Sequence, residues 1–203
     1  AFAGVQLKAL HTNMKQVAGD KYMLDYFRSS LTSLENVTLG ASVKSLGFGA
    51  FALCTSLRNI SIPAHVESIG NVAFQGCSSL VTVHVPASVR SLGEGAFLRC
   101  SSLVTVRLDD GVESIGKGTF QDCSSLVTVH VPGSVRSIGQ KAFFNCSSLH
   151  TLRIDSSDVA IHTSAFAGVQ LKALHTNMKQ VAGDKYMLDY FRSSLTSLEN
   201  VTL

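Results

Sequence analysis

The sequence predicts a repeat solenoid that is rich in β-structure, in which short helical or 3₁₀ turns close each coil. Three observations lead to this fold class. Four residue types recur with a 23-residue period, each repeat contains the alternating pattern of a half-buried strand, and the segments 1–39 and 165–203 are identical. A fixed period of this length is the signature of stacked structural units, so it takes precedence over local features.

The 23-residue period runs through residues 34–171, which we expect to form regular coils. Residues one period apart stack on one another in a solenoid, so each recurring residue type predicts a column of like side chains along the axis. The recurring positions are Cys54, Cys77, Cys100, Cys123 and Cys146; Gly47, Gly70, Gly93, Gly116 and Gly139; Phe51, Phe74, Phe97, Phe120, Phe143 and Phe166; and Leu34, Leu57, Leu80, Leu103, Leu126 and Leu149.

One coil is represented by residues 78–100, SSLVTVHVPASVRSLGEGAFLRC. The segment Val83-His84-Val85 alternates apolar and polar residues, as a half-buried strand does. Pro86 ends the strand because it has no N–H to donate. Gly93 permits a turn that a side chain would obstruct. Residues 96–100 then predict the short helical or 3₁₀ turn that closes the coil.

The identical segments 1–39 and 165–203 define a longer, 164-residue repeat. Counted by the first leucine of each unit, this super-repeat holds seven coils, and we expect residues 1–203 to form a single continuous solenoid. One unit is irregular. Its segments 13–30 and 177–194 predict a helix, because Met187, Leu188 and Phe191 have helical spacing. This helix is either a packing variant that changes the curvature or a docking element for a neighbouring chain.

The chain opens at Ala1 within a coil, and no polar capping repeat closes either end. Open solenoid ends are sheet edges that invite further pairing. The sequence therefore leads us to expect an excerpt from a longer array or a head-to-tail polymer. Seven coils would advance about 34 Å along the axis at the usual spacing of parallel strands.

The overall composition favours a folded chain with a large core. Hydrophobic residues make up 45% of the 203 residues and charged residues only 15%, which argues against disorder. The net charge of +3 gives no reason to expect nucleic acid as a partner. No run of eighteen apolar residues is present, so no insertion into a membrane is predicted.

The cysteines have a structural interpretation. A single-file column cannot converge on a tetrahedral zinc ion, and CxxC pairs are absent. An odd number of five cysteines also argues against a full disulfide framework. We therefore expect small apolar core residues at Cys54, Cys77, Cys100, Cys123 and Cys146. No acid–base pair, catalytic triad or phosphate-binding loop is visible, so the sequence predicts no metal, no cofactor and no enzyme.

One outward column of the strands is a candidate binding stripe. It alternates histidine and arginine over several coils, which suits an acidic partner or an anionic glycan and would bind more strongly at low pH. The alternative is an ordinary solvated sheet face. The stripe consists of Ser61, His84, Arg107, His130, Arg153 and His175.

A second outward column alternates in charge, so neighbouring coils would place opposite charges side by side. We interpret this column as selecting the register of the stack, and it indicates a 46-residue double unit. It consists of Lys44, Glu67, Arg90, Glu113 and Arg136.

Four sequons for N-glycosylation occur in the chain. Those at Asn36, Asn59 and Asn200 are the candidates, whereas the sequon at Asn145 contains a cysteine that we expect to be buried. A glycan at Asn36 or Asn59 would crowd the sheet face beside the stripe.

The pattern SSL-x-x-V-x-V-P-x-SV-x-S-(L/I)-G-x-x-AF-x-x-C resembles the BspA-like, or Treponema-type, leucine-rich repeat over residues 31–174. The resemblance implies a curved right-handed leucine-rich-repeat solenoid with a parallel sheet on one face. It also implies an extracellular or cell-surface location, binding to a host or matrix macromolecule or to other cells, and no catalytic residues.

The function that the sequence favours is a non-catalytic structural repeat module of a filament, appendage or coat, with copies of itself as partners. The identical 39-residue segments support this hypothesis. One alternative is an adhesion or recognition protein that binds a macromolecule or an anionic glycan on its sheet face. A second alternative is an engineered repeat scaffold.

Overall fold

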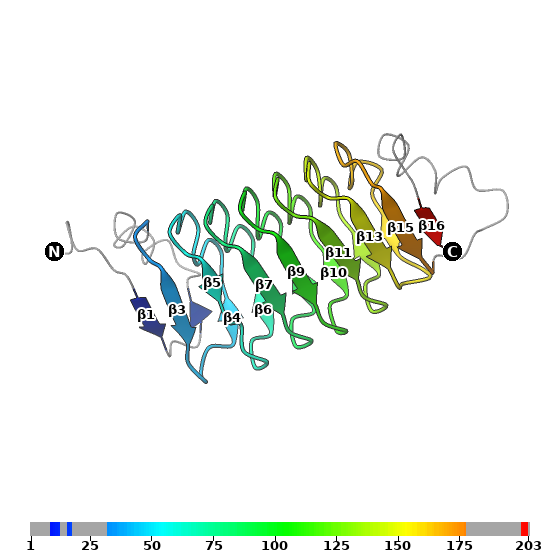
Figure 1. Cartoon of the computed structure of the whole chain (residues 1–203). Coiled ribbons are helices and arrows are strands. Elements are labelled where there is room, and N and C mark those ends of the chain that lie inside the picture. The colour runs from blue at the N-terminus through cyan, green and yellow to red at the C-terminus, as the bar shows by residue number, and fades with distance from the viewer. Residues whose placement is uncertain (1–8, 13–15, 18–31, 178–199, 203) are drawn as a thin grey trace.

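The computed structural model describes residues 9–12, 16–17, 32–177 and 200–202. Over these residues the chain is a solenoid built from two parallel sheets, and each coil adds one strand to each sheet (Figure 1). The described part of the chain contains no helix, and therefore no helix that could cross a membrane.

The larger sheet, sheet A, has nine strands. Every pairing is parallel, and each strand pairs with the corresponding residues of the next coil, as Val83 with Val106. In spatial order the strands are β1 (Ala9–Thr12), β3 (Asn36–Leu39), β5 (Asn59–Ile60), β7 (Thr82–Val85), β9 (Thr105–Leu108), β11 (Thr128–Val131), β13 (Thr151–Ile154), β15 (Ala173–Thr176) and β16 (Asn200–Thr202).

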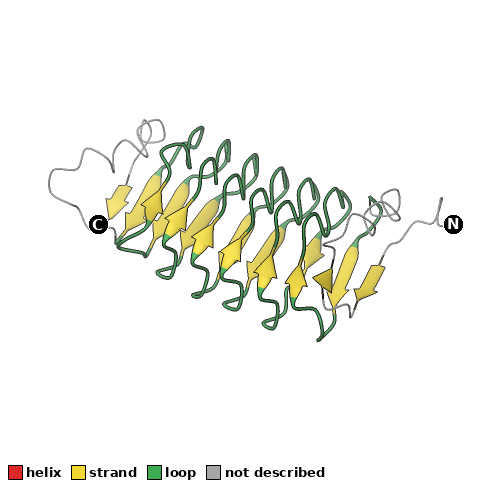
Figure 2. Ribbon diagram, turned by 180° about the vertical axis from the view of Figure 1, so that it is seen from behind, coloured by secondary structure: helices red, strands yellow, loops and turns green. Residues whose placement is uncertain are grey.

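The smaller sheet, sheet B, lies behind sheet A and consists of seven two-residue strands (Figure 2). The sequence predicted only one sheet face, and the second sheet is an addition to that prediction. Its strands are β2 (Gln16–Val17), β4 (Ser45–Leu46), β6 (Ser68–Ile69), β8 (Ser91–Leu92), β10 (Ser114–Ile115), β12 (Ser137–Ile138) and β14 (Ala160–Ile161).

The strands form where the sequence alternates. In β7 the side chains of Thr82 and His84 are exposed while those of Val83 and Val85 are buried. This pattern places one face of sheet A in the core and the other in solvent. Pro86 follows β7 directly, and its carbonyl accepts a hydrogen bond from the amide of Val89 at 3.0 Å, which turns the chain toward sheet B.

The core contains the columns that the 23-residue period predicts. The six phenylalanines from Phe51 to Phe166 are buried, and successive rings stack with centroids 5.1–5.4 Å apart. The five cysteines are also fully buried and free. From Cys77 onward each thiol donates to a phenylalanine carbonyl of the preceding coil, as Cys100 Sγ does to Phe74 O at 3.1 Å.

The segment that closes each coil is not the helical or 3₁₀ turn that the sequence predicted. Between Gly95 and Cys100, successive amides alternate between carbonyl acceptors of the next coil and carbonyl acceptors of their own coil. The amides of Gly95, Phe97 and Arg99 each donate 2.8 Å bonds to the next coil, whereas those of Ala96, Leu98 and Cys100 donate within the turn. A helix would keep all these bonds internal. Inter-coil bonding wins because it extends the pairing of the sheets around the whole coil.

Most of the irregular unit predicted to be helical, 13–30 and 177–194, lies outside the described residues. Where its first copy is described, the prediction is wrong, because Gln16 and Val17 form strand β2 and pair with Ser45 and Leu46 of β4. These two residues precede the methionine and leucine whose spacing suggested a helix. They occupy instead the position that forms the sheet B strand in the other described coils.

The glycine column marks a close approach of successive coils. The backbone conformation of Gly93 is an ordinary one, but a Cβ atom there would lie 2.4 Å from the carbonyl carbon of Gly70. A Cβ atom at Gly70 would likewise lie 2.9 Å from the carbonyl carbon of Gly47. A side chain in this column would force two coils apart, so the glycines serve inter-coil packing rather than the turn alone.

We expect Gly93→Ala to lower the free energy of unfolding by about 1–3 kcal/mol, because the added methyl overlaps backbone that cannot move aside. The matched control is Gly133→Ala, where a Cβ atom would meet only Asp155 O at 3.9 Å and where Ala87 stands in an equivalent coil. The control should leave stability unchanged or raise it. Urea unfolding curves measure both, and equal losses would contradict the packing argument.

Val72 has a backbone φ of +50°, a conformation that suits glycine and strains a β-branched residue. Equivalent coils place Gly49, Gly95 and Gly118 there. We expect Val72→Gly to raise the free energy of unfolding by about 0.5–1 kcal/mol, after the greater freedom of glycine in the unfolded chain is subtracted.

Val104→Gly is the control for Val72→Gly. Val104 is an exposed valine without the left-handed conformation, so its replacement should destabilise the protein. Thermal and urea midpoints of the two variants should therefore move in opposite directions, and parallel shifts would show that the strain at Val72 is negligible.

Candidate functional site

The outer face of sheet A carries the stripe that the sequence singled out. The strand register places His84 beside Arg107, and likewise Arg153 beside both His130 and His175. Ser61 follows β5 in the same column and is exposed. The structure therefore brings the six predicted residues into one row across the strands, although His175 is only half-exposed.

Two aspartates that sequence reasoning missed join this row. Asp109 and Asp155 each lie two positions after an arginine of the row and bind both neighbours. Asp109 Oδ2 accepts from His84 Nε2 at 2.7 Å, and its Oδ1 accepts from Arg107 Nε at 3.1 Å. We call this arrangement a His–Asp–Arg cluster.

The second His–Asp–Arg cluster repeats the first one two coils later. Asp155 Oδ2 accepts from His130 Nε2 at 2.6 Å, and Oδ1 accepts from Arg153 Nε at 2.7 Å. In each cluster the histidine belongs to one coil while the aspartate and arginine belong to the next. Each carboxylate thus ties two coils together and has both oxygens occupied.

A signal for these aspartates was present in the sequence. The position after the strand reads Pro63, Pro86, Asp109, Pro132 and Asp155. From residue 84 to residue 155, proline follows the strands of His84 and His130, and aspartate follows the strands of Arg107 and Arg153. The residue types thus covary along the 46-residue double unit, which marks the aspartates as partners of the row.

The clusters hold their carboxylates ionised. The bond from Arg153 lowers the pKa of Asp155; partial burial opposes this shift, and the hydrogen bond and charge of His130 reinforce it. For Asp109 partial burial raises the pKa, but the combined bonds and charges of His84 and Arg107 outweigh it and bring the pKa below its usual value. The same pairing raises the pKa of Arg153.

Each arginine of the clusters is hydrogen-bonded through Nε, while most of its side chain is exposed to solvent. Their side chains are 72% exposed at Arg107 and 59% at Arg153. Among the described residues, the bond from Nε to aspartate is the only side-chain hydrogen bond or ion pair that either arginine forms. The terminal Nη atoms therefore keep their donors available on a side chain that is anchored at Nε, which is a suitable arrangement for binding an anion.

The cysteine column shows no sign of reactive or metal-binding chemistry. Burial is the largest cause that raises the pKa of Cys146, to about 12, and it also raises that of Cys123. These thiols remain protonated and act as hydrogen-bond donors. Val169 takes the cysteine place in the next coil and is equally buried. Within the described residues, no three histidine, cysteine or acidic side chains are grouped so as to hold a metal ion.

The alternating charge column forms two of the ion pairs that its pattern predicts, Lys44 with Glu67 and Arg90 with Glu113. Both pairs are well exposed, so each adds at most about 1 kcal/mol. A third inter-coil pair, Glu94 with Lys117 at 2.8 Å, lies on the closing turns. All three join neighbouring coils, which agrees with a role in selecting the register.

Two of the glycosylation candidates lie on the same face as the stripe. Asn36 and Asn59 are exposed at the start of β3 and β5, and they pair in register. Asn200 lies in β16, where side chains are outside the described set. Asn145 is exposed even though its neighbour Cys146 is buried. Glycosylation at any of these residues stays a prediction.

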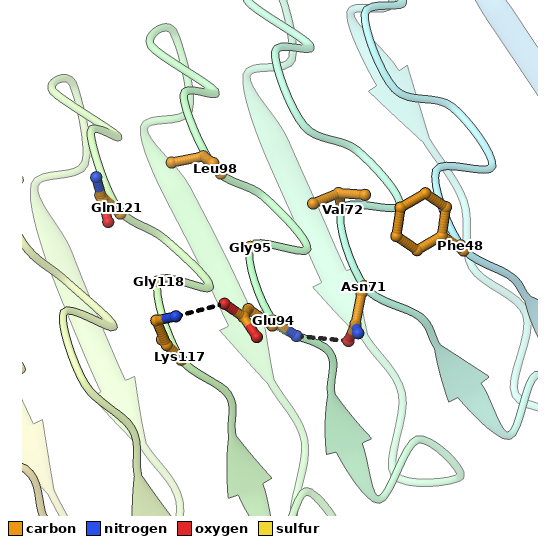
Figure 3. Close-up of a pocket in the computed structure, with 9 residues that line it drawn as sticks. All are labelled: Phe48, Asn71, Val72, Glu94, Gly95, Leu98, Lys117, Gly118 and Gln121. Atoms are coloured by element: carbon orange, nitrogen blue, oxygen red, sulfur yellow. Dashed lines mark hydrogen bonds and ion pairs between the residues drawn. The ribbon is translucent and has the colours of Figure 1, made fainter.

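A depression of about 320 Å³ lies over the closing turns (Figure 3). Phe48, Val72 and Leu98 line it together with the Glu94–Lys117 pair, and Asn71 Oδ1 accepts a bond from the Glu94 amide at 2.9 Å. None of the predicted site residues contributes to it. Its polar groups are already paired, so the outer face of sheet A remains the candidate site.

The chain is similar to known repeat proteins. The BspA type leucine rich repeat region, in six copies, matches residues 23–146 and 103–202. No curated protein matches the chain. A leucine rich repeat protein of T. pallidum has a similar structure, with 27% identity, a TM-score of 0.58, and coverage of 86% of this chain and 68% of that one.

Two further solved structures share the fold. A leucine rich cell surface protein of Faecalibacterium prausnitzii is 20% identical with a TM-score of 0.59, and the match covers 98% of this chain and 64% of that one. A leucine-rich repeat protein of Eubacterium ventriosum is 16% identical with a TM-score of 0.54, with coverage of 96% and 57%. The chain thus spans roughly three fifths to two thirds of these proteins.

The lowered pKa of Asp155 predicts how the cluster affects stability. A carboxylate whose pKa is lower in the folded state stabilises the fold above its unfolded value, near 3.9, and loses this effect as the pH falls through the folded pKa. We expect Asp155→Asn to lower the thermal midpoint by about 1–4 °C at pH 7 and to match the parent chain near pH 2. Thermal melts followed by circular dichroism measure both differences.

The control for Asp155→Asn is Asp110→Asn. Asp110 is exposed and forms no ion pair with a described residue. Its variant should follow the parent chain at both pH values. A pH-independent loss in Asp155→Asn would mean that packing, not the charge, accounts for the effect.

Proposed function

Because the chain belongs to the BspA type leucine-rich repeat family, whose repeats build a solenoid rather than a catalytic centre, we propose that it is a non-catalytic structural module of a long extracellular or cell-surface assembly. The module has the 164-residue period of the sequence and continues head-to-tail into further copies of itself. The proposal covers a filament, an appendage or a coat.

One observation carries this proposal: the sequence repeat and the structural repeat coincide. Strand β1 pairs with β3 by matching Ala9 with Asn36 and Leu10 with Val37. The same residues, one super-repeat later, pair in the same register, Ala173 with Asn200 and Leu174 with Val201. One module can therefore follow another without any change in pairing, which is the requirement for an array that grows by repetition.

Location outside the cell is part of the proposal. The family resemblance implies it, and the F. prausnitzii protein of the same fold is described as a cell surface protein. Immunogold labelling of intact cells that carry the gene would show the module on the outside. Labelling that requires permeabilised cells would contradict this location.

The outer face of sheet A favours a second candidate function, recognition of a macromolecule by an adhesion protein. The specific observation is the row of two His–Asp–Arg clusters, which projects from a face that core packing does not need. The two functions are compatible, because a structural array can display a binding face at every module.

The structural proposal predicts the length of an extended chain. When residues 40–203 are appended after Leu203, the super-repeat continues in phase, and the maximum dimension should increase by about 34 Å, seven coils of parallel strand spacing. Small-angle X-ray scattering and negative-stain images would measure this growth as a single straight or gently curved rod.

The control chain omits residues 40–50 from the appended segment, so the same coils join out of phase. It should show two bodies with a variable angle rather than one rod. If the in-phase chain also forms two bodies, or grows by much less than one module length, the head-to-tail proposal is wrong.

A further inference from the structure

We propose that the outer face of sheet A binds a linear acidic polysaccharide laid along the solenoid axis, with Arg107 and Arg153 contacting its anionic groups and His84 and His130 strengthening the contact at acid pH. This ligand goes beyond the structural role proposed above and is independent of it, because the binding face is complete within one module. The ligand class is a chain of sugars that bears carboxylate or sulfate groups at regular intervals.

The arginines provide the anion contacts. Each Nε donates to its aspartate, at 3.1 Å for Arg107 and 2.7 Å for Arg153, and this bond fixes the direction of the guanidinium group. The Nη donors remain available to a ligand, and the planar guanidinium group matches a carboxylate or sulfate. Because the group is already oriented, binding loses less side-chain entropy than at a mobile arginine.

The spacing of the arginines favours a polysaccharide over an acidic peptide. Arg107 and Arg153 lie two coils apart, which is about 9.6 Å at the usual distance between parallel strands. An extended peptide repeats its same-side residues about every 6.8 Å and falls out of step with this row. A polysaccharide with one acidic group per disaccharide places its charges at wider and regular intervals, as the row requires.

The surface beside the row suits sugar rings. A column of threonines runs parallel to the stripe, and its hydroxyl groups can donate to and accept from sugar hydroxyls. The valine that directly precedes each of three of these threonines is 39–42% exposed, and it offers apolar surface to the C–H face of a ring. These columns consist of Thr82, Thr105, Thr128 and Thr151, and of Val81, Val104 and Val127.

The histidines make binding depend on pH. In each cluster the aspartate occupies Nε2, so the neutral ring presents Nδ1 to its surroundings as an acceptor. Protonation would convert Nδ1 into a donor and add a positive charge next to the arginine that contacts the anion. The charged groups around His84 are Asp109 and Arg107 on the next coil; those around His130 are Arg107 on one side and Arg153 with Asp155 on the other.

The sign of the pH effect follows from these charges. With neutral histidines, each arginine is balanced by its aspartate and the row carries no net charge. Histidine is the side chain whose charge changes between pH 5 and 8. The aspartates stay ionised in that range because their pKa values are lowered, so protonation of a histidine would add one positive charge to its cluster. Affinity for a polyanion therefore increases as the pH falls.

Isothermal titration calorimetry on the whole chain tests the proposal with three named probes at pH 7.5 and 5.5. The probes are a hyaluronan decasaccharide, which carries carboxylates, a heparin decasaccharide, which also carries sulfates, and poly-L-glutamate as the acidic peptide. The salt concentration is held at about 0.1 M, because exposed charges are screened. We expect a polysaccharide to bind about tenfold more tightly at pH 5.5 than at pH 7.5.

The paired variant Arg107→Gln with Arg153→Gln should lower the affinity about tenfold at both pH values. Its matched control is Arg90→Gln with Arg136→Gln. These arginines are likewise one double unit apart, the loss of Arg90 also leaves an acidic partner, Glu113, unpaired, and the change in net charge is the same. The control should bind within about twofold of the parent chain.

Two further variants separate charge from geometry. His84→Asn with His130→Asn should keep the affinity at pH 7.5 and abolish its increase at pH 5.5. Arg107→Lys with Arg153→Lys keeps the charge but loses the fixed pair of donors, so its affinity should be intermediate. Circular dichroism melts verify that each variant is folded, and the lysine pair serves if the glutamine pair does not fold.

Three results would overturn the proposal. Equal losses in the Arg107/Arg153 and Arg90/Arg136 variants would show attraction by overall charge alone. Tighter binding of poly-L-glutamate than of both polysaccharides would identify an acidic protein as the partner. Absence of binding by all three probes at pH 5.5 would remove the site. None of these results bears on rod growth, so the structural proposal is tested separately.

Discussion

The structure depends on one constraint: the backbone of every coil hydrogen-bonds to the same positions of the next coil. The bonds run through sheet A, sheet B and the closing turn, as from Val104 N to Val81 O, Glu113 N to Arg90 O and Phe97 N to Thr119 O. Because they surround the coil, a single 23-residue offset holds in sheet A from β3 to β13. The sequence must therefore repeat, since each position is stacked on its own equivalents.

Stacking identical residues of successive coils on one another has different consequences in the core and on the surface. Phenylalanine on phenylalanine gives stacked rings at favourable distances, and glycine on glycine permits a close backbone approach. Like charges at this spacing would repel, so charged columns cannot use one residue type. They alternate instead, as Arg90 with Glu113. The 46-residue double unit is thus the electrostatic consequence of a 23-residue backbone period.

This constraint explains how much could be predicted. Alternation along residues such as Val83 and Val85 specified sheet A and its core, because burial on one face dictates the pattern. The closing turn was misjudged, since amides such as Gly95 N choose between local and inter-coil carbonyls by geometry that spacing does not encode. Asp109 was missed because the repeat aligns residues that are 23 positions apart, whereas Asp109 and its partner His84 are 25 positions apart.

The His–Asp–Arg clusters cannot be explained by register selection alone. The pairs of Lys44 with Glu67, Arg90 with Glu113 and Glu94 with Lys117 already penalise a slipped stack. In the same stripe the coil of Ser61 lacks a cluster and keeps its pairing in β5, so the fold does not require one. A cluster also differs from these pairs because its aspartate binds two partners, a histidine of the preceding coil and an arginine of its own coil. Two such arginines, fixed at their bases and repeated in the period of the solenoid, are what a repetitive anionic ligand requires.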